Sequence, residues 1–284
     1  MRLIDTIYID GGFVTPHGTE LFDLHNPATA QVIGRVRLAD EEDARTAIAA
    51  AKRAFPAFSR TSKAERIALL RRMHAAIKAR REKLLEAIVE EYGAPVSRAG
   101  FMADHPANVL LDMARVLEDD RFTRRVGSAE VMMEPLGVAG LITPWNSDAG
   151  FICGKLAAAI AAGCTAVVKP SKMSAIQTQV VTEALHEAGL PAGVFNILTG
   201  RCGFGDEERM RTTFQRHLAI SPRDYRGSIL KLISIKSLFG SMNGHVRPWN
   251  SRTPAERFNA SGAPAAARPL RTSTTRTSTS GRLF

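Results

Sequence analysis

The segment from residue 138 to residue 198 alternates short apolar runs with segments of helical periodicity, and this alternation constrains the fold most strongly. Three runs have the length and apolarity of buried strands, at residues 138–142, 165–168 and 194–198. Between them lie two helical patterns, residues 149–162 and a pattern that Ser174 and Gln177 open. Short connections of this kind give right-handed crossovers, so the sequence predicts a β-α-β-α-β unit with a parallel sheet.

The upstream sequence predicts a hairpin followed by helices. Residues 7–13 alternate apolar and polar residues up to a Gly-Gly pair, which is typical of a short hairpin. Asp40, with Asp43 three residues later, is expected to open a helix that runs through Phe55 and is ended by Pro56. A long helix should run from the capping pair Ser62 and Glu65 to about Tyr92, and a third should cover residues 99–118.

Polar residues follow each predicted strand of the parallel unit, at residues 143–146, 169–172 and 199–201. The carboxyl ends of parallel strands lie at one edge of a sheet, and ligands of such sheets bind there. The strands themselves are apolar, so the contrast predicts a binding site at this edge.

The net charge of +10 is confined to one part of the 284-residue chain. Residues 201–284 contain 15 Lys+Arg and 5 Asp+Glu, whereas residues 1–200 contain 23 of each. The two parts are therefore interpreted separately. The basic segment has no recognisable nucleic-acid module, so no specific nucleic-acid partner is expected.

The cysteine content and the apolar segments indicate in which cellular compartment the protein is expected. Three cysteines make no disulfide framework and no metal-binding pattern, which favours a reducing environment. The first ten residues do not resemble a secretory signal. The longest apolar stretch, residues 156–168, is shorter than the about 20 residues that cross a bilayer. We expect a cytoplasmic protein without a membrane partner or a bound metal.

Several motifs, in order, resemble those of the NAD(P)-dependent aldehyde dehydrogenase superfamily. They are Asn26-Pro27-Ala28-Thr29, Pro135-Leu136-Gly137-Val138, Pro144-Trp145-Asn146, Ala161-Ala162-Gly163-Cys164-Thr165, Lys169-Pro170-Ser171, Glu187-Ala188-Gly189-Leu190-Pro191 and Gly193-Val194-Phe195-Asn196. The resemblance implies an α/β fold with an incomplete Rossmann-like parallel sheet of the cofactor domain, an N-terminal hairpin and helices. It implies NAD or NADP as cofactor and an aldehyde as substrate. The expected regions are 1–201, the incomplete aldehyde dehydrogenase part, and 202–284, an unrelated, largely disordered basic tail.

The resemblance assigns roles to residues around the first strand end. Asn146 resembles the catalytic donor of an oxyanion hole; the alternative is a turn residue that caps the next helix. Trp145 is expected either in the core or in the wall of the cofactor cleft. Ile142, Thr143 and Pro144 resemble the backbone beside the nicotinamide ribose.

The resemblance also assigns cofactor contacts beyond the second and third strands. Lys169 resembles the lysine that binds the adenosine ribose; the alternative is a solvated charge. Ser171 and Gly200 are placed among the cofactor-binding positions. At position 172 the family commonly has Glu, which accepts hydrogen bonds from the ribose hydroxyls, whereas this chain has Lys172. Lys172 either favours a 2′-phosphate, and so NADP, or is a lesion at an unselected position.

The chemistry of the family requires a cysteine nucleophile and a glutamate base, which the resemblance places in Gly-Gln-x-Cys and Glu-Leu-Gly-Gly segments. Neither string occurs in this sequence. Cys153 and Cys164 are expected to be packing residues, and Cys202 follows the cofactor strand, where the nucleophile does not belong. We therefore expect no aldehyde oxidation by the chain as written.

The sequence after about residue 201 suggests a product truncated or frame-shifted at that point. It is rich in Arg, Ser and Thr and poor in acidic residues, which is typical of translation in a shifted frame of a GC-rich gene. The remaining alternatives are a catalytically dead dinucleotide-binding or subunit-pairing fragment and a non-functional translation product.

Residues 126–134 resemble part of an arm that pairs between subunits, so a homo-oligomer is expected if this arm pairs. An exposed edge strand is expected in the incomplete sheet.

Overall fold

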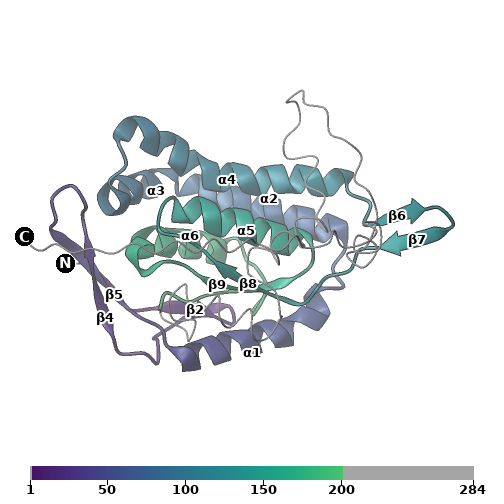
Figure 1. Ribbon diagram of the computed structural model, residues 1–284, viewed down its shortest axis with the longest axis horizontal. Helices are drawn as coiled ribbons and strands as arrows, with labels where there is room; N and C mark the ends of the chain where they lie inside the picture. The colour runs from purple at the N-terminus through teal and green to yellow at the C-terminus, as the bar shows by residue number, and fades with distance from the viewer. Residues whose placement is uncertain (1, 201–284) are drawn as a thin grey trace, which may run out of the picture. The chain divides into compact units, whose positions relative to one another are not determined.

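The computed structural model describes residues 2–200 of the chain (Figure 1). A five-stranded sheet has the order β3-β2-β10-β9-β8. Its strands are β2 (Ile7–Ile9), β3 (Gly12–Val14), β8 (Val138–Ile142), β9 (Thr165–Lys169) and β10 (Phe195–Ile197). The helices of the β-α-β-α-β unit are α5 (Asp148–Ala161) and α6 (Ala175–Glu187), and a 3₁₀ turn η2 (Lys172–Ser174) precedes α6. The predicted α/β fold class is confirmed.

The three predicted strands pair in parallel. Val138 lies opposite Thr165 in the β8–β9 pair, and Phe195 lies opposite Ala166 in the β9–β10 pair. The short connections between strands and helices account for this arrangement, because each crossover returns the chain to the same sheet edge.

The sheet is not purely parallel, because the N-terminal hairpin joins it. β2 and β3 pair antiparallel, and Tyr8 of β2 lies opposite Ile197 of β10. The Tyr8 ring stacks on the ring of Phe195 with centroids 4.6 Å apart, and its hydroxyl lies 3.0 Å from His186 Nδ1 of α6. The sequence predicted the hairpin but not this long-range pairing.

The opposite edge of the sheet is β8, which pairs with β9 alone within residues 2–200. Its residues are half-buried or exposed, whereas β10 is fully buried. The expectation of a buried first strand is therefore wrong, and the expectation of an exposed edge strand is confirmed for the described residues. The cause is the one-sided pairing of β8, which leaves its other edge uncovered by any described residue.

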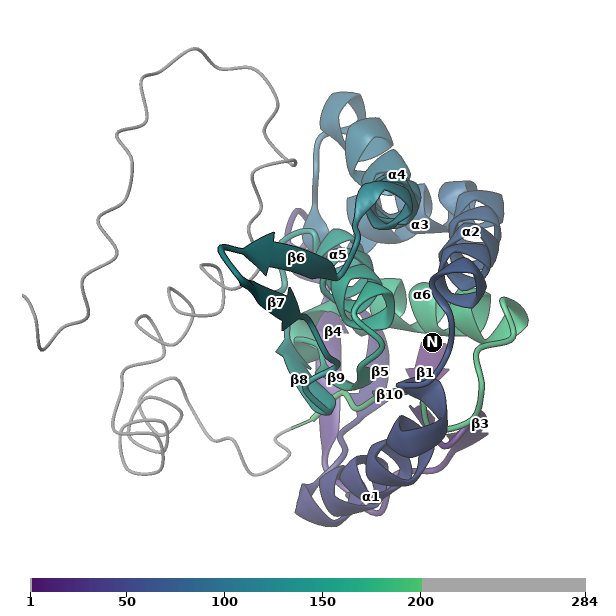
Figure 2. The ribbon, with the colours of Figure 1, turned by 90° about the vertical axis from the view of Figure 1, so that its right-hand side faces the viewer.

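Helices α5 and α6 cover one face of this sheet, and a further helical layer packs on them (Figures 1 and 2). It contains α2 (Lys63–Ala79), α3 (Arg81–Ala87), a π-helical turn η1 (Ile88–Tyr92) and α4 (Val96–Asp119), and α1 (Glu41–Phe58) lies on the other side of the sheet. The main apolar core lies between the helices and the sheet, with Leu70, Met73, Leu110 and Ile152 fully buried. Within residues 2–200, no helix combines the length and the apolarity that crossing a bilayer requires.

Two predicted helix boundaries are wrong. Pro56 does not end α1 but lies inside it, and the helix continues to Phe58. The Phe58 side chain is 4% exposed in the core, so its burial offsets the backbone hydrogen bond that proline cannot make. The long helix expected between Ser62 and Tyr92 is instead divided at Arg80, whose guanidinium bonds Glu183 and Glu187 of α6.

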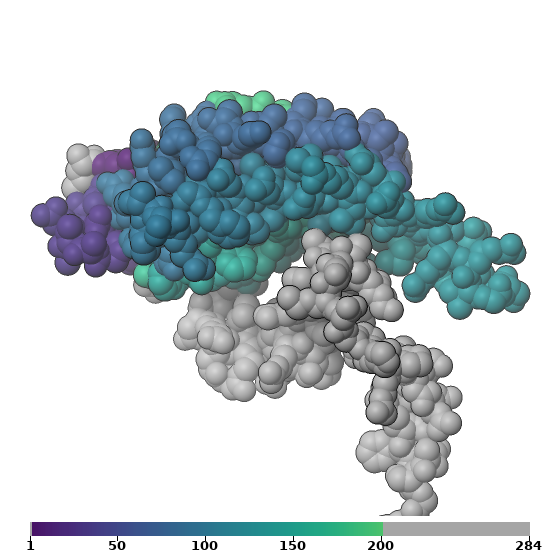
Figure 3. Space-filling model, turned by 90° about the horizontal axis from the view of Figure 1, so that it is seen from above, coloured from purple at the N-terminus to yellow at the C-terminus, as the bar shows by residue number. Residues whose placement is uncertain are grey.

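Two smaller sheets flank this arrangement. One has the order β1-β5-β4, from β1 (Arg2–Ile4), β4 (Leu21–His25) and β5 (Val32–Arg37). The other is the hairpin of β6 (Thr123–Val126) and β7 (Ala129–Met132), with Val126 opposite Ala129. Figure 3 shows the teal hairpin projecting beyond the helical face. Its residues are largely exposed, so the folded core of the described residues does not cover it.

Candidate functional site

The carboxyl ends of β8, β9 and β10 meet at one edge of the sheet. The Thr143 N–H donates to the Lys169 carbonyl oxygen at 3.1 Å, and the Leu198 N–H donates to the Val168 carbonyl oxygen at 2.9 Å. The structure thus brings the three predicted groups of residues to one edge, where a ligand of such a sheet binds.

Gly200 lies directly against the backbone of Ala39, in an isolated parallel bridge, and a Cβ at position 200 would overlap that backbone. The Ala39 N–H also donates to the Thr199 carbonyl oxygen at 2.8 Å. This close approach explains why the chain has glycine here. The bridge and this hydrogen bond also join the segment after β10 to the segment between β5 and α1.

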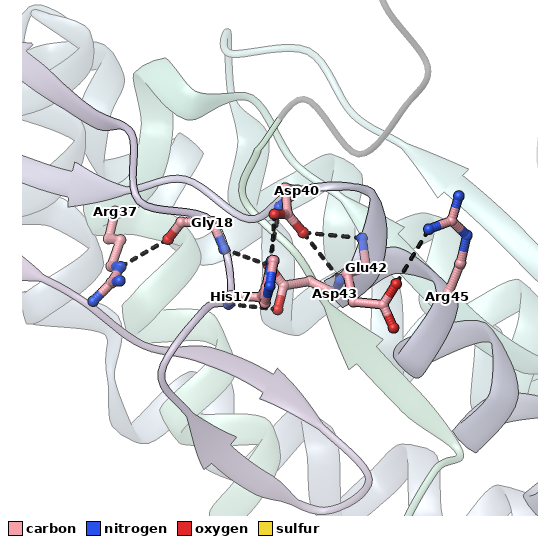
Figure 4. Close-up of polar contacts among 7 residues, drawn as sticks. All are labelled: His17, Gly18, Arg37, Asp40, Glu42, Asp43 and Arg45. Carbon is pink, nitrogen blue, oxygen red and sulfur yellow. Dashed lines mark hydrogen bonds and ion pairs between the residues drawn. The ribbon is translucent and has the colours of Figure 1, made fainter.

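The N-terminus of α1 is fixed beside this bridge by two aspartates (Figure 4). Asp40 accepts from the N–H groups of Glu42 and Asp43, and Asp43 accepts from the N–H of His17 at 2.8 Å. The His17 imidazole lies 2.7 Å from Asp40, and this hydrogen bond raises the pKa of His17 and lowers that of Asp40. The predicted capping by Asp40 and Asp43 is confirmed.

Asn146 lies exposed in the loop between β8 and α5. The residue at the N-cap of α5 is Ser147, with φ of +65°, and no side chain caps that helix. The alternative in which Asn146 caps the helix is therefore wrong. Within the described part of the chain, no hydrogen bond holds the Asn146 amide, so it is available to a ligand.

The neighbours of Asn146 line the same loop. Thr143 is buried, Ile142 is half-buried and Pro144 is exposed. Trp145 is 46% exposed, and its ring packs against that of Tyr92 with centroids 5.3 Å apart. The Trp145 ring therefore lies at the surface beside Asn146 rather than in the core.

Lys169 and the turn after it form the second part of the edge. Lys169 ends β9 and is half-buried. The Ser171 hydroxyl accepts from the Met173 N–H at 3.2 Å and so shapes the turn. The Lys172 ammonium lies 4.2 Å from the centre of the Phe22 ring of β4, an arrangement that favours the cation.

Two buried carboxyl groups behind this edge were missed by the sequence analysis. Asp148 is fully buried and accepts from the hydroxyls of Thr143, Ser174 and Thr178. Burial raises the pKa of Asp148 to about 6, against the lowering effect of these bonds. The sequence placed Ser174 as a helix cap, but its hydroxyl bonds Asp148 and makes no cap to α6.

The second carboxyl is Glu91 of η1, which accepts from the N–H groups of Ile176 at 2.7 Å and Gln177 at 3.1 Å. Burial raises the pKa of Glu91 to about 7. The Gln177 side chain donates to Glu91 as well, so it does not cap α6 in the way the sequence predicted. The only sequence signal for Glu91 was a carboxylate within the apolar pattern of the expected long helix, and no sequence signal marked Asp148 as buried.

The two described thiols are unsuited to nucleophilic attack. Cys153 is fully buried on α5, and burial raises the pKa of its thiol strongly. Cys164 is 7% exposed in the turn before β9. Both lie in the apolar core, as expected of packing residues. Cys202 and the predicted disordered tail lie outside the described residues.

Comparisons with known proteins agree on one family. A sequence model described as the aldehyde dehydrogenase family matches residues 13–209. A 3-succinoylsemialdehyde-pyridine dehydrogenase of a Pseudomonas species is 40% identical over 202 residues, which are 70% of this chain and 42% of that protein. A putative aldehyde dehydrogenase of Staphylococcus haemolyticus is 33% identical over 229 residues, 80% of this chain and 47% of that protein.

Solved structures give the same result. An aldehyde dehydrogenase C mutant from Pseudomonas syringae, complexed with NAD+ and octanal, has a TM-score of 0.68 and 37% identity over 73% of this chain and 43% of that chain. A betaine aldehyde dehydrogenase mutant from Staphylococcus aureus, complexed with NAD+, has a TM-score of 0.66 and 31% identity over 70% of this chain and 42% of that chain. The chain thus spans less than half the length of these relatives.

Proposed function

Because this chain belongs to the aldehyde dehydrogenase family, we propose that its strand-end edge binds NAD or NADP and that the chain does not turn over an aldehyde. The observation that carries the binding proposal is the convergence of three strand ends, with Thr143 bonded to Lys169 and Gly200 held against Ala39. An exposed edge with polar loops at the end of parallel strands fits a dinucleotide.

The residues at this edge have distinct proposed roles. Lys169 would bind the adenosine ribose, beside the turn that contains Ser171 and Lys172. The backbone of residues 142–144 and the Trp145 ring would line the nicotinamide-ribose side. A bound nicotinamide would accept hydride. The Asn146 amide, which makes no hydrogen bond within residues 2–200, is suited to donate to an oxygen that gains negative charge.

The proposed lack of turnover rests on the thiols. Thioester chemistry needs an accessible thiolate, whereas Cys153 and Cys164 are buried in the core. The sequence contains no Gly-Gln-x-Cys or Glu-Leu-Gly-Gly string to supply the nucleophile and base of the family. The aldehyde is therefore proposed as the substrate of the parent activity only.

Two measurements on the purified full chain test the proposal. NADH fluorescence should show saturable binding that Lys169→Ala weakens about tenfold, since hydrogen bonds to charged groups contribute about 1.5–3 kcal/mol. The exposed Lys52→Ala is the matched control. A panel of aldehydes with NAD or NADP should give no reduced cofactor. Sustained turnover, or an acyl adduct trapped on a thiol, would overturn the proposed inactivity.

The same experiments separate the remaining alternatives. Saturable NADH binding together with a cooperative melt is the result expected of a dinucleotide-binding module. A chain that neither melts cooperatively nor binds NADH would be a non-functional product. We also propose a boundary near residue 201, a cytoplasmic location, and self-association through the β6–β7 hairpin.

A further inference from the structure

Asp148 joins three separate elements behind the strand-end edge. Its carboxylate accepts from Thr143 after β8, from Ser174 at the end of η2 at 2.7 Å, and from Thr178 of α6 at 3.0 Å. Within residues 2–200, no cationic side chain forms an ion pair with Asp148. A fully buried carboxyl held by hydroxyls alone is costly to keep charged.

The hydroxyls lie beside the two loops of the proposed cofactor edge. Thr143 and Asp148 bracket the loop that presents Asn146, and Ser174 closes the turn that presents Lys172. We propose that Asp148 is a positioning residue that couples these two loops, and that gain or loss of its proton changes their geometry. This inference deepens the proposed function and rests on it for the link to a dinucleotide.

The two hydroxyls from η2 and α6 that donate to Asp148 each have a second acceptor. These second acceptors explain how a proton on Asp148 could change the loop geometry. The Ser174 hydroxyl also lies 3.2 Å from the Ser171 carbonyl oxygen, and the Thr178 hydroxyl lies 2.9 Å from the Ser174 carbonyl oxygen. Toward an ionised Asp148 both hydroxyls donate. A protonated Asp148 donates its own proton to one of them, and that hydroxyl then turns to its carbonyl. When the Ser174 hydroxyl turns in this way, protonation of Asp148 strengthens the hydrogen bond from Ser174 to the Ser171 carbonyl oxygen and so tightens that turn.

Other titratable groups face Asp148 and its helix. Lys169 of β9 favours the ionised carboxylate, whereas the charge of Asp148 disfavours ionisation of Glu91 of η1 and of Cys153 of α5. His105 of α4 packs closely against Gly150 in the first turn of α5. A test must therefore separate Asp148 from His105 and Glu91.

Trp145 provides a readout that needs no cofactor, because it lies in the loop between Thr143 and Asp148. Replacing Trp249, the other tryptophan of the chain, with Phe makes Trp145 the sole tryptophan emitter. In this background the emission of Trp145 should titrate between about pH 5 and about pH 7. Asp148→Asn should abolish that change, because asparagine keeps the acceptor for Thr143 and its amide can donate to Ser174 or Thr178.

Control variants make the assignment specific. Asp112→Asn, at an exposed aspartate of α4, should titrate as the parent does. Thr178→Val removes one donor to the carboxylate and should move the midpoint to higher pH, which tests the network even if Asp148→Asn fails to fold. Loss of the pH response in His105→Gln or Glu91→Gln but not in Asp148→Asn would overturn the inference, as would an emission independent of pH.

Cofactor binding gives the second readout. NADH affinity of the full chain should change about fivefold between the two ends of this pH range, and Asp148→Asn should remove the dependence. A Trp145 titration that follows Asp148, with no NADH or NADPH binding at any pH, would refute the proposed function and leave the coupling of the loops intact. NADH binding with the same pH dependence in Asp148→Asn would refute the coupling and leave the proposed function intact.

Discussion

The guanidinium of Arg66 lies directly beneath Gly163, so close that a Cβ at position 163 would lie 2.5 Å from the Arg66 Cζ. Arg66 is 7% exposed and donates to the carbonyl oxygens of Ala161 at 3.3 Å and Ser59 at 2.9 Å. The end of α5 is therefore stabilised by a buried cation from α2, and glycine leaves the space for it.

Gly163→Ala is expected to lower the free energy of unfolding by more than about 2 kcal/mol. Its φ of +77° costs an alanine about 1–2 kcal/mol, and the Arg66 guanidinium must also move. Gly189→Ala is the matched control, because it shares a φ of +69° but has nothing within 4 Å of the added Cβ. Equal losses for both variants in urea unfolding would contradict the role given to Arg66.

Stability should fall as the pH rises from about 4 to about 7. Burial raises the pKa of Glu91 from 4.5 to about 7 and that of Asp148 from 3.8 to about 6. Each group favours folding below its unfolded pKa, and this contribution is lost as the pH rises through the folded pKa. The loss for Glu91 is at most about 3 kcal/mol, at about 1.4 kcal/mol for each pKa unit.

The variant Glu91→Gln should flatten this dependence of the melting temperature on pH. The exposed Glu86→Gln of α3 should leave the dependence unchanged. Parallel melting curves of Glu91→Gln and the parent chain across this pH range would show that Glu91 does not titrate in the folded state.

Lys172→Glu should shift the cofactor preference from NADPH toward NADH by about tenfold, or about 1.4 kcal/mol. A cation at this turn can pair with a 2′-phosphate, whereas a carboxylate accepts from the ribose hydroxyls. The ratio of the two dissociation constants measures the effect, with Lys52→Glu as control. An unchanged ratio would favour the alternative in which Lys172 is a lesion.

Val131→Pro should abolish self-association without lowering the melting temperature. Proline cannot donate in the β6–β7 ladder, where Val131 lies opposite Arg124, and this hairpin stands apart from the apolar core. Sedimentation at several concentrations measures the assembly state. A parent chain that is monomeric throughout would refute pairing through the hairpin.

The nucleotide sequence across codons 195–215 tests the origin of the basic segment. A shifted frame should encode a Phe-Thr-Gly-Ser or a Gly-Gln-x-Cys string beyond residue 201. If neither alternative frame contains such a string, the hypothesis of a frame shift is wrong.

Much of the scaffold followed from local sequence signals. The strands at residues 138–142 and 165–168 and the helix cap at Asp40 depend on neighbouring residues alone, and the structure has them where expected. The boundary at Pro56 was wrong because the gain came from burying Phe58, which the local pattern does not encode.

The candidate site divides in the same way. The sequence by itself determined which residues follow each strand, because parallel crossovers bring strand ends to one edge whatever the helices contain. Only the tertiary structure decided that Gly200 meets Ala39, that Lys172 faces Phe22, and that Asp148 and Glu91 are buried. These contacts join residues far apart in the chain, and their energy depends on desolvation and packing that no local periodicity records.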